Sequence, residues 1–345
     1  MGNVNDDRAP VMTDVARAAG VFHQTVSRVL NDHPNVRSDT RDRVLAAIRE
    51  LGYRPNVAAR TLVTRRTGTL GVIGFNTTLY GPASMLYGIE QAAKQHDYFV
   101  TVAALAALDR RSVLDAVERL RDQAVEGIIV IAPQTTAVGA LANVPSDVPL
   151  VAVGCGTHAS LASVAMDNES GAQRATAYLL DLGHRTVHHL AGPATWLDAQ
   201  EREAGWRSAL HARGAPVPEP LTGGDWSART GFEHGLRLAR DLSVTAVFCA
   251  NDHMALGLLR ALQQAGRRIP EDVSVVGFDD IPEAEYFGPP LTTVRQDFDE
   301  LGRRALGSLI GLIDRHGVPS RPSAIPRVSI EPSLVVRASV ARPPR

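Results

Sequence analysis

The pattern of apolar positions divides the chain into two regions. Near the N-terminus apolar residues recur at helical spacing, with Val26, Val29 and Leu30 at i, i+3 and i+4 of one segment. From Leu70 onward, short apolar runs alternate with longer amphipathic segments. This change of pattern predicts a small helical head followed by a larger body that mixes strands and helices.

The head is predicted to contain three short helices. The first is capped by Thr13 or Asp14 and stops at Gly20, the second covers 23–31, and the third covers 38–51. A glycine-containing turn joins the first two helices. This is the arrangement of a helix-turn-helix.

Residues 54–67 are expected to connect head and body as a hinge helix, too short to be stable alone, and a linker. In the body, alternating strands and helices predict parallel sheets with helices on both faces. Two such lobes are expected, with a ligand cleft beyond the carboxyl ends of their strands. The expected strands are 70–75, 99–103, 127–131, 150–153, 186–191, 246–249 and 273–276, and the expected helices are 85–95, 112–123, 171–182, 201–213 and 254–264.

Charge is distributed unevenly between these regions. The formal net charge is only -1, which taken alone argues against a nucleic-acid-binding protein. Between Met12 and Arg66, however, ten arginines stand against five acidic residues, a surplus of five positive charges. A basic head on an acidic remainder is typical of a DNA-binding module joined to a second function.

Several classes of protein are disfavoured by what the chain lacks. Cys155 and Cys249 are far apart, so neither a disulfide framework nor a cysteine-rich zinc site is expected. The segment Met1–Pro10 is polar, and no apolar run approaches the roughly 20 residues that span a membrane. We therefore expect a cytoplasmic protein without a metal, a cofactor or a membrane contact.

A set of motifs resembles the lactose-repressor/galactose-repressor (LacI/GalR) family. They run in family order along nearly the whole chain, and together they are far more specific than any one alone. They are Thr13–Ala16, Gly20–Val21 and Gln24–Asn31 in the head, and Leu190–Pro193, Ala204–Trp206, Gly224–Ser227, Ala250–Asp252, Val275–Asp280 and Pro289–Phe298 in the body.

The resemblance implies a transcriptional repressor with a periplasmic-binding-protein-like body. We expect the helix-turn-helix domain at 1–53, the hinge and linker at 54–67, and the two-lobed core at 68–340. The N-terminal lobe would take about 68–166 and 297–325, and the C-terminal lobe about 167–294 and 326–340.

The start of the second helix is predicted to read DNA bases. His23 and Gln24 lie in its first turn and Arg28 one turn later, and all three side-chain types can bond base edges in the major groove. Thr25, Ser27 and Asn31 have short polar side chains suited to phosphate contacts, and Asn56 at the start of the hinge is also expected to bind DNA.

The hinge carries the other predicted DNA contact, Leu62. The resemblance implies that the Leu62 side chains of two subunits wedge between base pairs in the minor groove. Two heads and two wedges imply a homodimer on a pseudo-palindromic operator. No leucine heptad follows Ser333, so no tetramer-forming helix is expected.

Polar and aromatic residues of the body motifs are predicted to bind a small sugar, such as a galactoside. The resemblance implies that Arg202, Asn251, Asp279 and Gln296 make polar contacts and that Trp226 stacks on the sugar ring. Each residue also has a structural explanation: Asn251 could cap the next helix, Asp279 a turn, and Trp226 could belong to the core.

The chain departs from the family pattern beside this cleft. The resemblance implies a carboxylate where the chain has Gly154, so one acceptor is lost. Trp196 and Asp198 also differ and are expected to remodel the pocket. A sugar would relieve operator binding by favouring one arrangement of the lobes. The sequence leaves the sign open, and we expect induction because galactose-type members are usually induced.

Other functions remain as alternatives. A periplasmic sugar-binding protein would have a signal peptide and no basic head. An enzyme is not expected, because the chain has no nucleophile elbow, P-loop or dinucleotide fingerprint. His184, His188 and His189 more simply pack or face solvent than bind a metal. A regulator that responds to a nucleoside, or acts with a corepressor, remains the alternative within the family.

Overall fold

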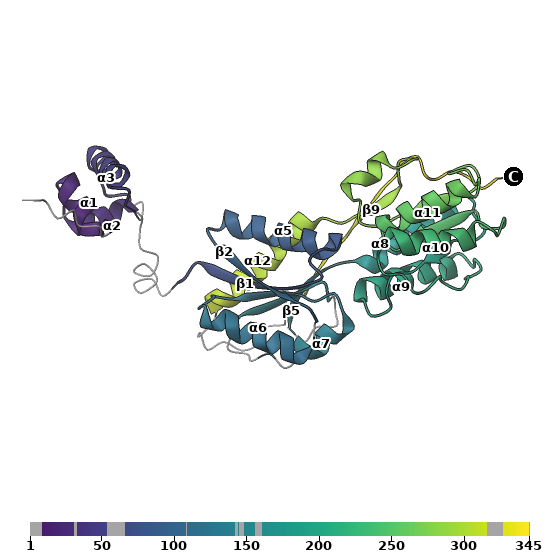
Figure 1. Ribbon diagram of the computed structural model, residues 1–345, viewed down its shortest axis with the longest axis horizontal. Coiled ribbons are helices and arrows are strands. Elements are labelled where there is room, and N and C mark those ends of the chain that lie inside the picture. The colour runs from purple at the N-terminus through teal and green to yellow at the C-terminus, as the bar shows by residue number, and fades with distance from the viewer. Residues whose placement is uncertain are drawn as a thin grey trace, which may run out of the picture. The chain divides into compact units, whose positions relative to one another are not determined.

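The computed structural model describes residues 9–30, 33–53, 66–107, 109–141, 144, 148–155, 161–315 and 327–344. The chain forms two compact units that divide between Thr67 and Gly68. Each unit is described by itself below, and Figure 1 gives the element labels.

The described part of the first unit is a bundle of three helices: α1 (Met12–Ala19), α2 (His23–Leu30) and α3 (Ser38–Leu51). Its core joins one apolar stripe from each helix, represented by Val15, Val26 and Val44, which are fully buried. Gly20 ends α1 in the left-handed conformation at φ 64°, a conformation that glycine adopts without steric cost.

The predicted N-cap of α1 is wrong. The helix begins two or three residues earlier than expected, after Val11, and Asp14 lies inside its first turn. There the Asp14 carboxylate accepts a hydrogen bond from the Val11 N–H at 3.0 Å. Asp14 therefore supplies the acidic half of a capping box and stabilises the helix start from within.

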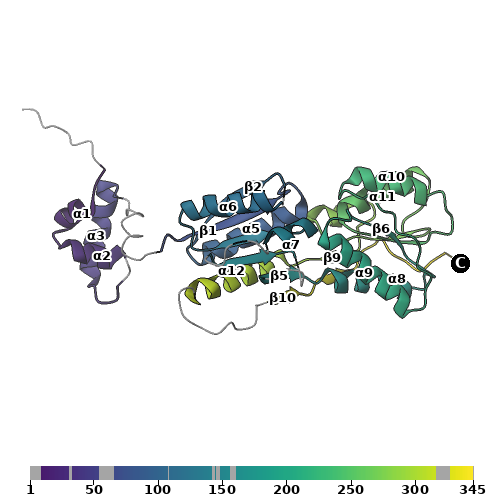
Figure 2. The same cartoon turned by 90° about the horizontal axis from the view of Figure 1, so that it is seen from below.

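The N-terminal lobe of the second unit is built on a six-stranded parallel sheet. The strand order is β10 (Arg327–Ile330), β5 (Ala162–Met166), β4 (Leu150–Val153), β3 (Ile128–Ile131), β1 (Thr69–Phe75) and β2 (Phe99–Leu105). Helices α5 (Tyr80–Gln95) and α12 (Phe298–Arg315) cover one face, and α6 (Arg110–Asp122) and α7 (Thr135–Leu141) cover the other (Figures 1 and 2).

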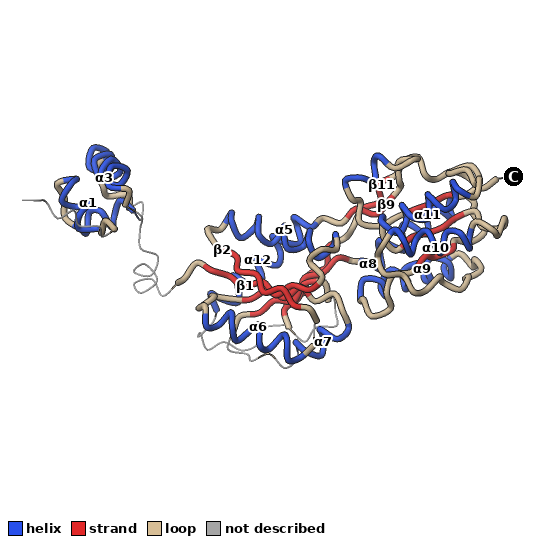
Figure 3. The backbone as a smooth tube through the Cα atoms, viewed as in Figure 1, coloured by secondary structure: helices blue, strands red, loops and turns tan. Residues whose placement is uncertain are grey.

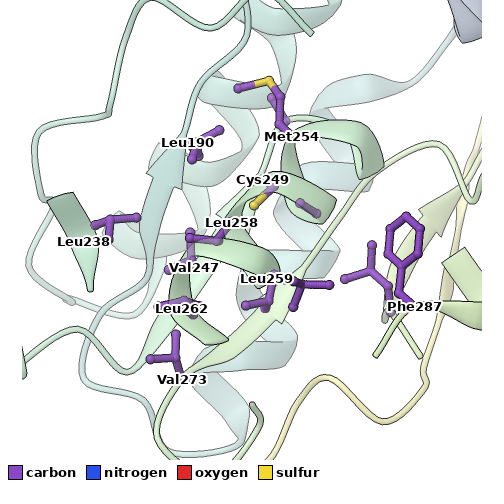
Figure 4. Close-up of a cluster of buried hydrophobic side chains, with 14 of the residues drawn as sticks. Leu190, Leu238, Val247, Cys249, Met254, Leu258, Leu259, Leu262, Val273 and Phe287 are labelled. Atoms are coloured by element: carbon purple, nitrogen blue, oxygen red, sulfur yellow. The ribbon is translucent and has the colours of Figure 1, made fainter. Parts of the chain in front are cut away.

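The C-terminal lobe repeats this design on a smaller parallel sheet of β6 (His188–Leu190), β7 (Ala246–Cys249) and β8 (Ser274–Val276). Helices α8 (Asn168–Asp181) and α9 (Leu197–Ala212) pack on one face. Helices α10 (Ala228–Leu238) and α11 (Asp252–Gln264) pack on the other, over the apolar cluster drawn in Figure 4. The 3₁₀ helix η2 (Pro282–Tyr286) follows β8.

Three chain segments pass between the lobes, after β5, before α12 and after β10. The last leads into β11 (Ser333–Val335), which pairs antiparallel with β9 (Thr293–Arg295) (Figure 3). This corrects one expected boundary: β10, assigned from sequence to the C-terminal lobe, pairs with β5 in the N-terminal sheet. The expected fold class of helix-turn-helix and parallel α/β core is confirmed.

Candidate DNA-reading face and ligand cleft

The exposed face of α2 carries the predicted base-reading residues. His23, Gln24 and Arg28 are exposed, while Val26 and Val29 on the opposite face are buried against the other helices. Thr25 and Ser27 are partly buried. The fold therefore brings all three base-reading candidates to one surface. Of the other predicted contacts, Asn31, Asn56 and Leu62 lie outside the described residues.

A cleft of about 290 Å³ lies between the two lobes of the body. Its N-terminal wall comes from the start of α5 and the loop before it, and its C-terminal wall from segments that follow β6, β7 and β8. The cleft brings all five predicted ligand residues together: Arg202, Trp226, Asn251, Asp279 and Gln296.

A buried ion pair forms the polar floor of this cleft. The Arg202 guanidinium lies 3.3 Å from Asp279 Oδ1, and Gln296 donates from Nε2 to the same oxygen at 2.6 Å. Arg202 also donates to the Ala250 carbonyl at 2.6 Å, and its Cζ lies 3.8 Å from the centroid of the Phe278 ring. Burial raises the pKa of Asp279 to about 6, against the opposing effect of Arg202. The three side chains therefore hold one another in place before any ligand binds.

Asn251 and Trp226 form the aromatic side of the cleft. Asn251 caps α11, accepting the Met254 N–H at 2.9 Å, and it donates to the Trp226 carbonyl at 3.2 Å. This second bond helps to hold Trp226 at a φ of 70°, which a non-glycine residue rarely adopts. Asn251 thus has a capping role and lines the cleft, and Trp226 is both buried and part of the wall.

Sequence reasoning missed several lining residues. Tyr80 begins α5, its ring packs edge to face on Phe298, and burial raises its pKa. Asp225 accepts hydrogen bonds from Ser227 and Thr230, which lower its pKa although partial burial opposes them. Asp225 lies in the motif Gly224–Ser227, which could have pointed to it, whereas Tyr80 belongs to none of the motifs. The complete lining is Thr78, Leu79, Tyr80, Gly81, Pro82, Met85, Trp196, Asp198, Arg202, Asp225, Trp226, Ser227, Ala228, Asn251, His253, Asp279 and Gln296.

The residues singled out as departures from the family pattern line the cleft or lie beside a lining residue. Trp196 and Asp198 line it, and burial raises the pKa of Asp198 to about 6. Gly154 has a φ of 80°, and a Cβ added there would lie 3.6 Å from the Met85 methyl, in ordinary contact with a lining residue. A second carboxyl, Glu201, has its pKa raised to about 7 by burial and by Asp198.

The histidines are packed in the C-terminal lobe. His184 contacts Thr245 and Ser274, and His189 is buried, donating from Nδ1 to the Phe248 carbonyl at 3.0 Å. Burial lowers the pKa of His189 to about 4. Among the described residues, no group of three or more histidine, cysteine or acidic side chains is arranged to hold a metal ion.

Comparison with known proteins places this architecture in a family. The model of bacterial regulatory proteins of the lacI family matches residues 11–56, and that of a periplasmic binding protein-like domain matches 176–340. The lactose operon repressor of Klebsiella pneumoniae is 34% identical over 334 residues, which cover 96% of this chain and 92% of that protein. The chain belongs to the LacI family of DNA-binding repressors.

The relatives of this LacI-family protein include more than one kind of repressor. The transcriptional repressor PurR of Vibrio parahaemolyticus is 34% identical over 338 residues, covering 95% of this chain and 98% of that one. A crystal structure of the lac repressor dimer bound to operator and the anti-inducer ONPF superposes with a TM-score of 0.82 at 32% identity, covering 97% of this chain and 100% of the other. These relatives are repressors, so the prediction that the chain is not an enzyme is confirmed. No helix of the described residues is long and apolar enough to cross a membrane.

Proposed function

We propose that this LacI-family repressor binds a pseudo-palindromic operator as a homodimer in the cytoplasm and releases it when a small neutral sugar, a galactoside or a related sugar, enters the cleft. The observation that carries the proposal is the preformed set of Arg202, Asp279 and Gln296 beside Trp226. Such a set offers charged and amide groups to hydroxyls and an apolar surface to the C–H side of a sugar ring.

The acidity of the cleft favours a sugar over a purine. Three carboxylates line it, from Asp198, Asp225 and Asp279. Ionised carboxylates only accept hydrogen bonds, so they match a ligand rich in hydroxyl donors. A purine base offers fewer donors, although its flat ring would also suit Trp226. A purine or nucleoside effector is therefore retained as an outcome of the test.

The DNA contacts follow from the exposed face of α2. Gln24 and Arg28 are one helical turn apart, and we assign them with His23 to base edges in the major groove. Thr25, Ser27 and Asn31 are assigned to phosphates, and Asn56 to a DNA contact at the start of the hinge. The hinge at 54–67 would contribute Leu62 as a minor-groove wedge, which kinks DNA at a cost of a few kcal/mol per unstacked step.

Dimer formation is supported by apolar side chains left on the surface of both lobes. In the N-terminal lobe, Phe99 on the edge strand β2 is 76% exposed, and Tyr87 on α5 is 59% exposed. In the C-terminal lobe, Tyr286 of η2 is 81% exposed and Leu256 of α11 is 41% exposed. Exposed apolar groups on an unpaired strand edge favour association with another chain. We propose that a second copy covers these positions.

The coupling would follow from the connections between the lobes. A sugar that contacts both walls favours the lobe arrangement to which it binds better, and it shifts DNA affinity only by that difference. Since β1 begins directly after the linker, a shift of the N-terminal lobe would displace the hinge. A hinge helix of one or two turns is marginal and would melt easily.

The test starts from DNA selected by the protein itself. Full-length protein would select sites from random duplexes, and the fluorescence anisotropy of the labelled site would then be followed during titration with sugars, purine bases and nucleosides. Release by a sugar alone supports the proposal. Release or tightening by a purine would replace the sugar, and failure to select a palindrome at low salt would refute the DNA-binding assignment.

A further inference from the structure

A second tryptophan lines the cleft beside Trp226. Trp196 immediately precedes α9, lines the cleft and is 6% exposed. Its ring meets that of Trp226 edge to face, with centroids 5.6 Å apart and planes at 78°. The two indoles therefore form a corner, and each can offer apolar surface to a different part of one ligand.

A carboxylate follows Trp196 by two residues in the first turn of α9. Asp198 lines the cleft, and its Oδ1 accepts a hydrogen bond from Asn168 Nδ2 at 3.3 Å. The same nitrogen donates to Glu201 at 3.2 Å, so one amide serves two carboxyl groups. Because a carboxylate has about four acceptor positions, Asp198 can accept further hydrogen bonds from a ligand.

An independent feature of the cleft residue Trp226 is an unsatisfied hydrogen-bond donor. The indole Nε1–H of Trp226 is buried and has no hydrogen-bond acceptor among the described residues. Buried donors in folded proteins are nearly always satisfied, by protein, water or ligand. The chain itself therefore supplies no acceptor for this donor among the described residues.

We propose, resting on the sugar effector proposed above, that Trp196 and Asp198 form a second sugar subsite and that the effector is a neutral disaccharide. One ring lies by Trp226 and bonds Arg202 and Asp279, while the other packs on Trp196 and donates a hydroxyl to Asp198. An anionic sugar is disfavoured because Arg202, the one arginine or lysine in the lining, is already paired with Asp279.

Calorimetry on the full-length protein tests this subsite. The probes are α- and β-linked disaccharides of glucose, galactose, xylose and mannose, each measured beside its monosaccharides. At least one disaccharide should bind roughly tenfold or more tightly than its parts. Asp198→Asn should reduce that ratio to about threefold or less, because it should weaken disaccharide binding more than monosaccharide binding. Trp196→Phe should retain most of the preference, and Trp196→Leu should lose it.

Asp181→Asn, which removes an exposed carboxylate on α8, is the matched control and should change neither affinity. Equal affinity for disaccharides and monosaccharides, or equal weakening of both by Asp198→Asn, would overturn the subsite and leave the sugar effector standing. If no sugar binds while the protein still binds its selected DNA, the sugar effector itself fails, and the subsite fails with it.

A separate observation concerns the head. Phe22 is 83% exposed, the highest value among the large exposed apolar side chains of the described residues. It immediately precedes α2, and its carbonyl accepts the Thr25 N–H at 2.8 Å, so it occupies the N-cap position. Serine, threonine and aspartate favour this position because their side chains accept a backbone N–H, which a phenyl ring cannot do.

A residue that breaks a local stability rule on the surface indicates a functional position. Phe22 adjoins His23 and Gln24 at the start of the helix assigned to the major groove. In that groove the only apolar group that varies with sequence is the 5-methyl of thymine, which phenylalanine can contact. We infer that Phe22 reads a thymine methyl and so adds to the sequence specificity of the head.

Replacing thymines by deoxyuridines, one position at a time in the selected operator, removes only the methyl group. The full-length protein should lose affinity by roughly three- to tenfold at one symmetry-related pair of positions. The operator affinity of Phe22→Ser should not change when the same thymines are replaced. Hydrogen exchange in α2 of this full-length variant should be unchanged or slower, because serine is a good N-cap. Leu45→Ser, at another exposed apolar position of the head, should keep the wild-type sensitivity. A wild-type protein insensitive at every thymine, a Phe22→Ser variant that keeps the sensitivity, or faster exchange in that variant would overturn the inference.

Discussion

Replacing Arg202 by methionine removes the guanidinium that pairs with Asp279 inside the cleft. The pair is buried, with Arg202 3% and Asp279 6% exposed. Methionine can keep much of the apolar contact with Phe278, but Asp279 would lose the guanidinium and keep the hydrogen bond from the Gln296 amide. Breaking a buried ion pair on one side typically costs about 3–5 kcal/mol, so we expect a loss of this size at pH 8.

Part of this loss should depend on pH. The folded-state pKa of Asp279 is already raised to about 6 from 3.8, and without Arg202 it rises further. Asp279 then binds a proton more tightly in the folded state than in the unfolded state. The loss of unfolding free energy is therefore complete above the folded-state pKa of Asp279, and it decreases as the pH falls. Since one pKa unit corresponds to about 1.4 kcal/mol, roughly 1–3 kcal/mol should be regained between pH 8 and pH 5.5.

Urea unfolding followed by tryptophan fluorescence measures this effect directly. The three tryptophans, Trp196, Trp206 and Trp226, all lie in the C-terminal lobe, so the signal reports on that lobe. Wild type, Arg202→Met and the double variant Arg202→Met/Asp279→Asn would be compared at pH 8 and 5.5. The double variant should lose the pH-dependent part of the penalty. A penalty that is equal at both pH values and unchanged by Asp279→Asn would refute the electrostatic explanation.

Three further variants test other parts of the structure. Gly88→Ala should destabilise the body by about 1–3 kcal/mol in urea unfolding, since its Cβ would lie 2.2 Å from the Phe298 carbonyl oxygen. Gly307→Ala is the control: an added Cβ there meets nothing within 4 Å, so this variant should be neutral or stabilising. Equal effects of the two variants would contradict the packing argument. Glu201→Gln should stabilise the protein by about 1–2 kcal/mol at pH 8, because the folded-state pKa of Glu201 is raised to about 7. That gain should shrink toward pH 5 as wild-type Glu201 takes up its proton, and a pH-independent gain would exclude this cause. Gln24→Ala or Arg28→Ala should weaken the selected operator by about 1–3 kcal/mol in anisotropy titrations and random DNA much less; equal weakening of both would mean phosphate contacts instead.

Much of the fold followed from local patterns. The spacing of Val26, Val29 and Leu30 fixed the buried face of α2, and therefore which side chains of that helix are exposed. Strands β1 to β4 and β6 to β8 were predicted as apolar runs, whereas β5, β9, β10 and β11 were not predicted. Asn251 and Asp279, named from family motifs, do follow strands β7 and β8, where ligands of parallel sheets bind.

Features that depend on distant parts of the chain were not predictable in this way. Strand β10 looked like a continuation of the C-terminal lobe, because nothing local indicates that it pairs with β5. Gly88 gave no signal in the sequence, yet it permits α5 and α12 to approach within contact of their backbones. Tyr80 lacked a motif, and its place in the cleft depends on how the two lobes meet.

The coupling between cleft and operator is tested most directly by measuring sugar affinity twice, on the free full-length protein and on the protein saturated with its selected operator. If a sugar in the cleft relieves DNA binding, it lowers the affinity of the protein for the operator by some factor. Linkage then requires the operator to lower the affinity for the sugar by the same factor. We predict that the two factors agree and exceed about fivefold. Equal sugar affinity with and without operator would contradict the account, because the cleft and the DNA-reading head would then be energetically independent.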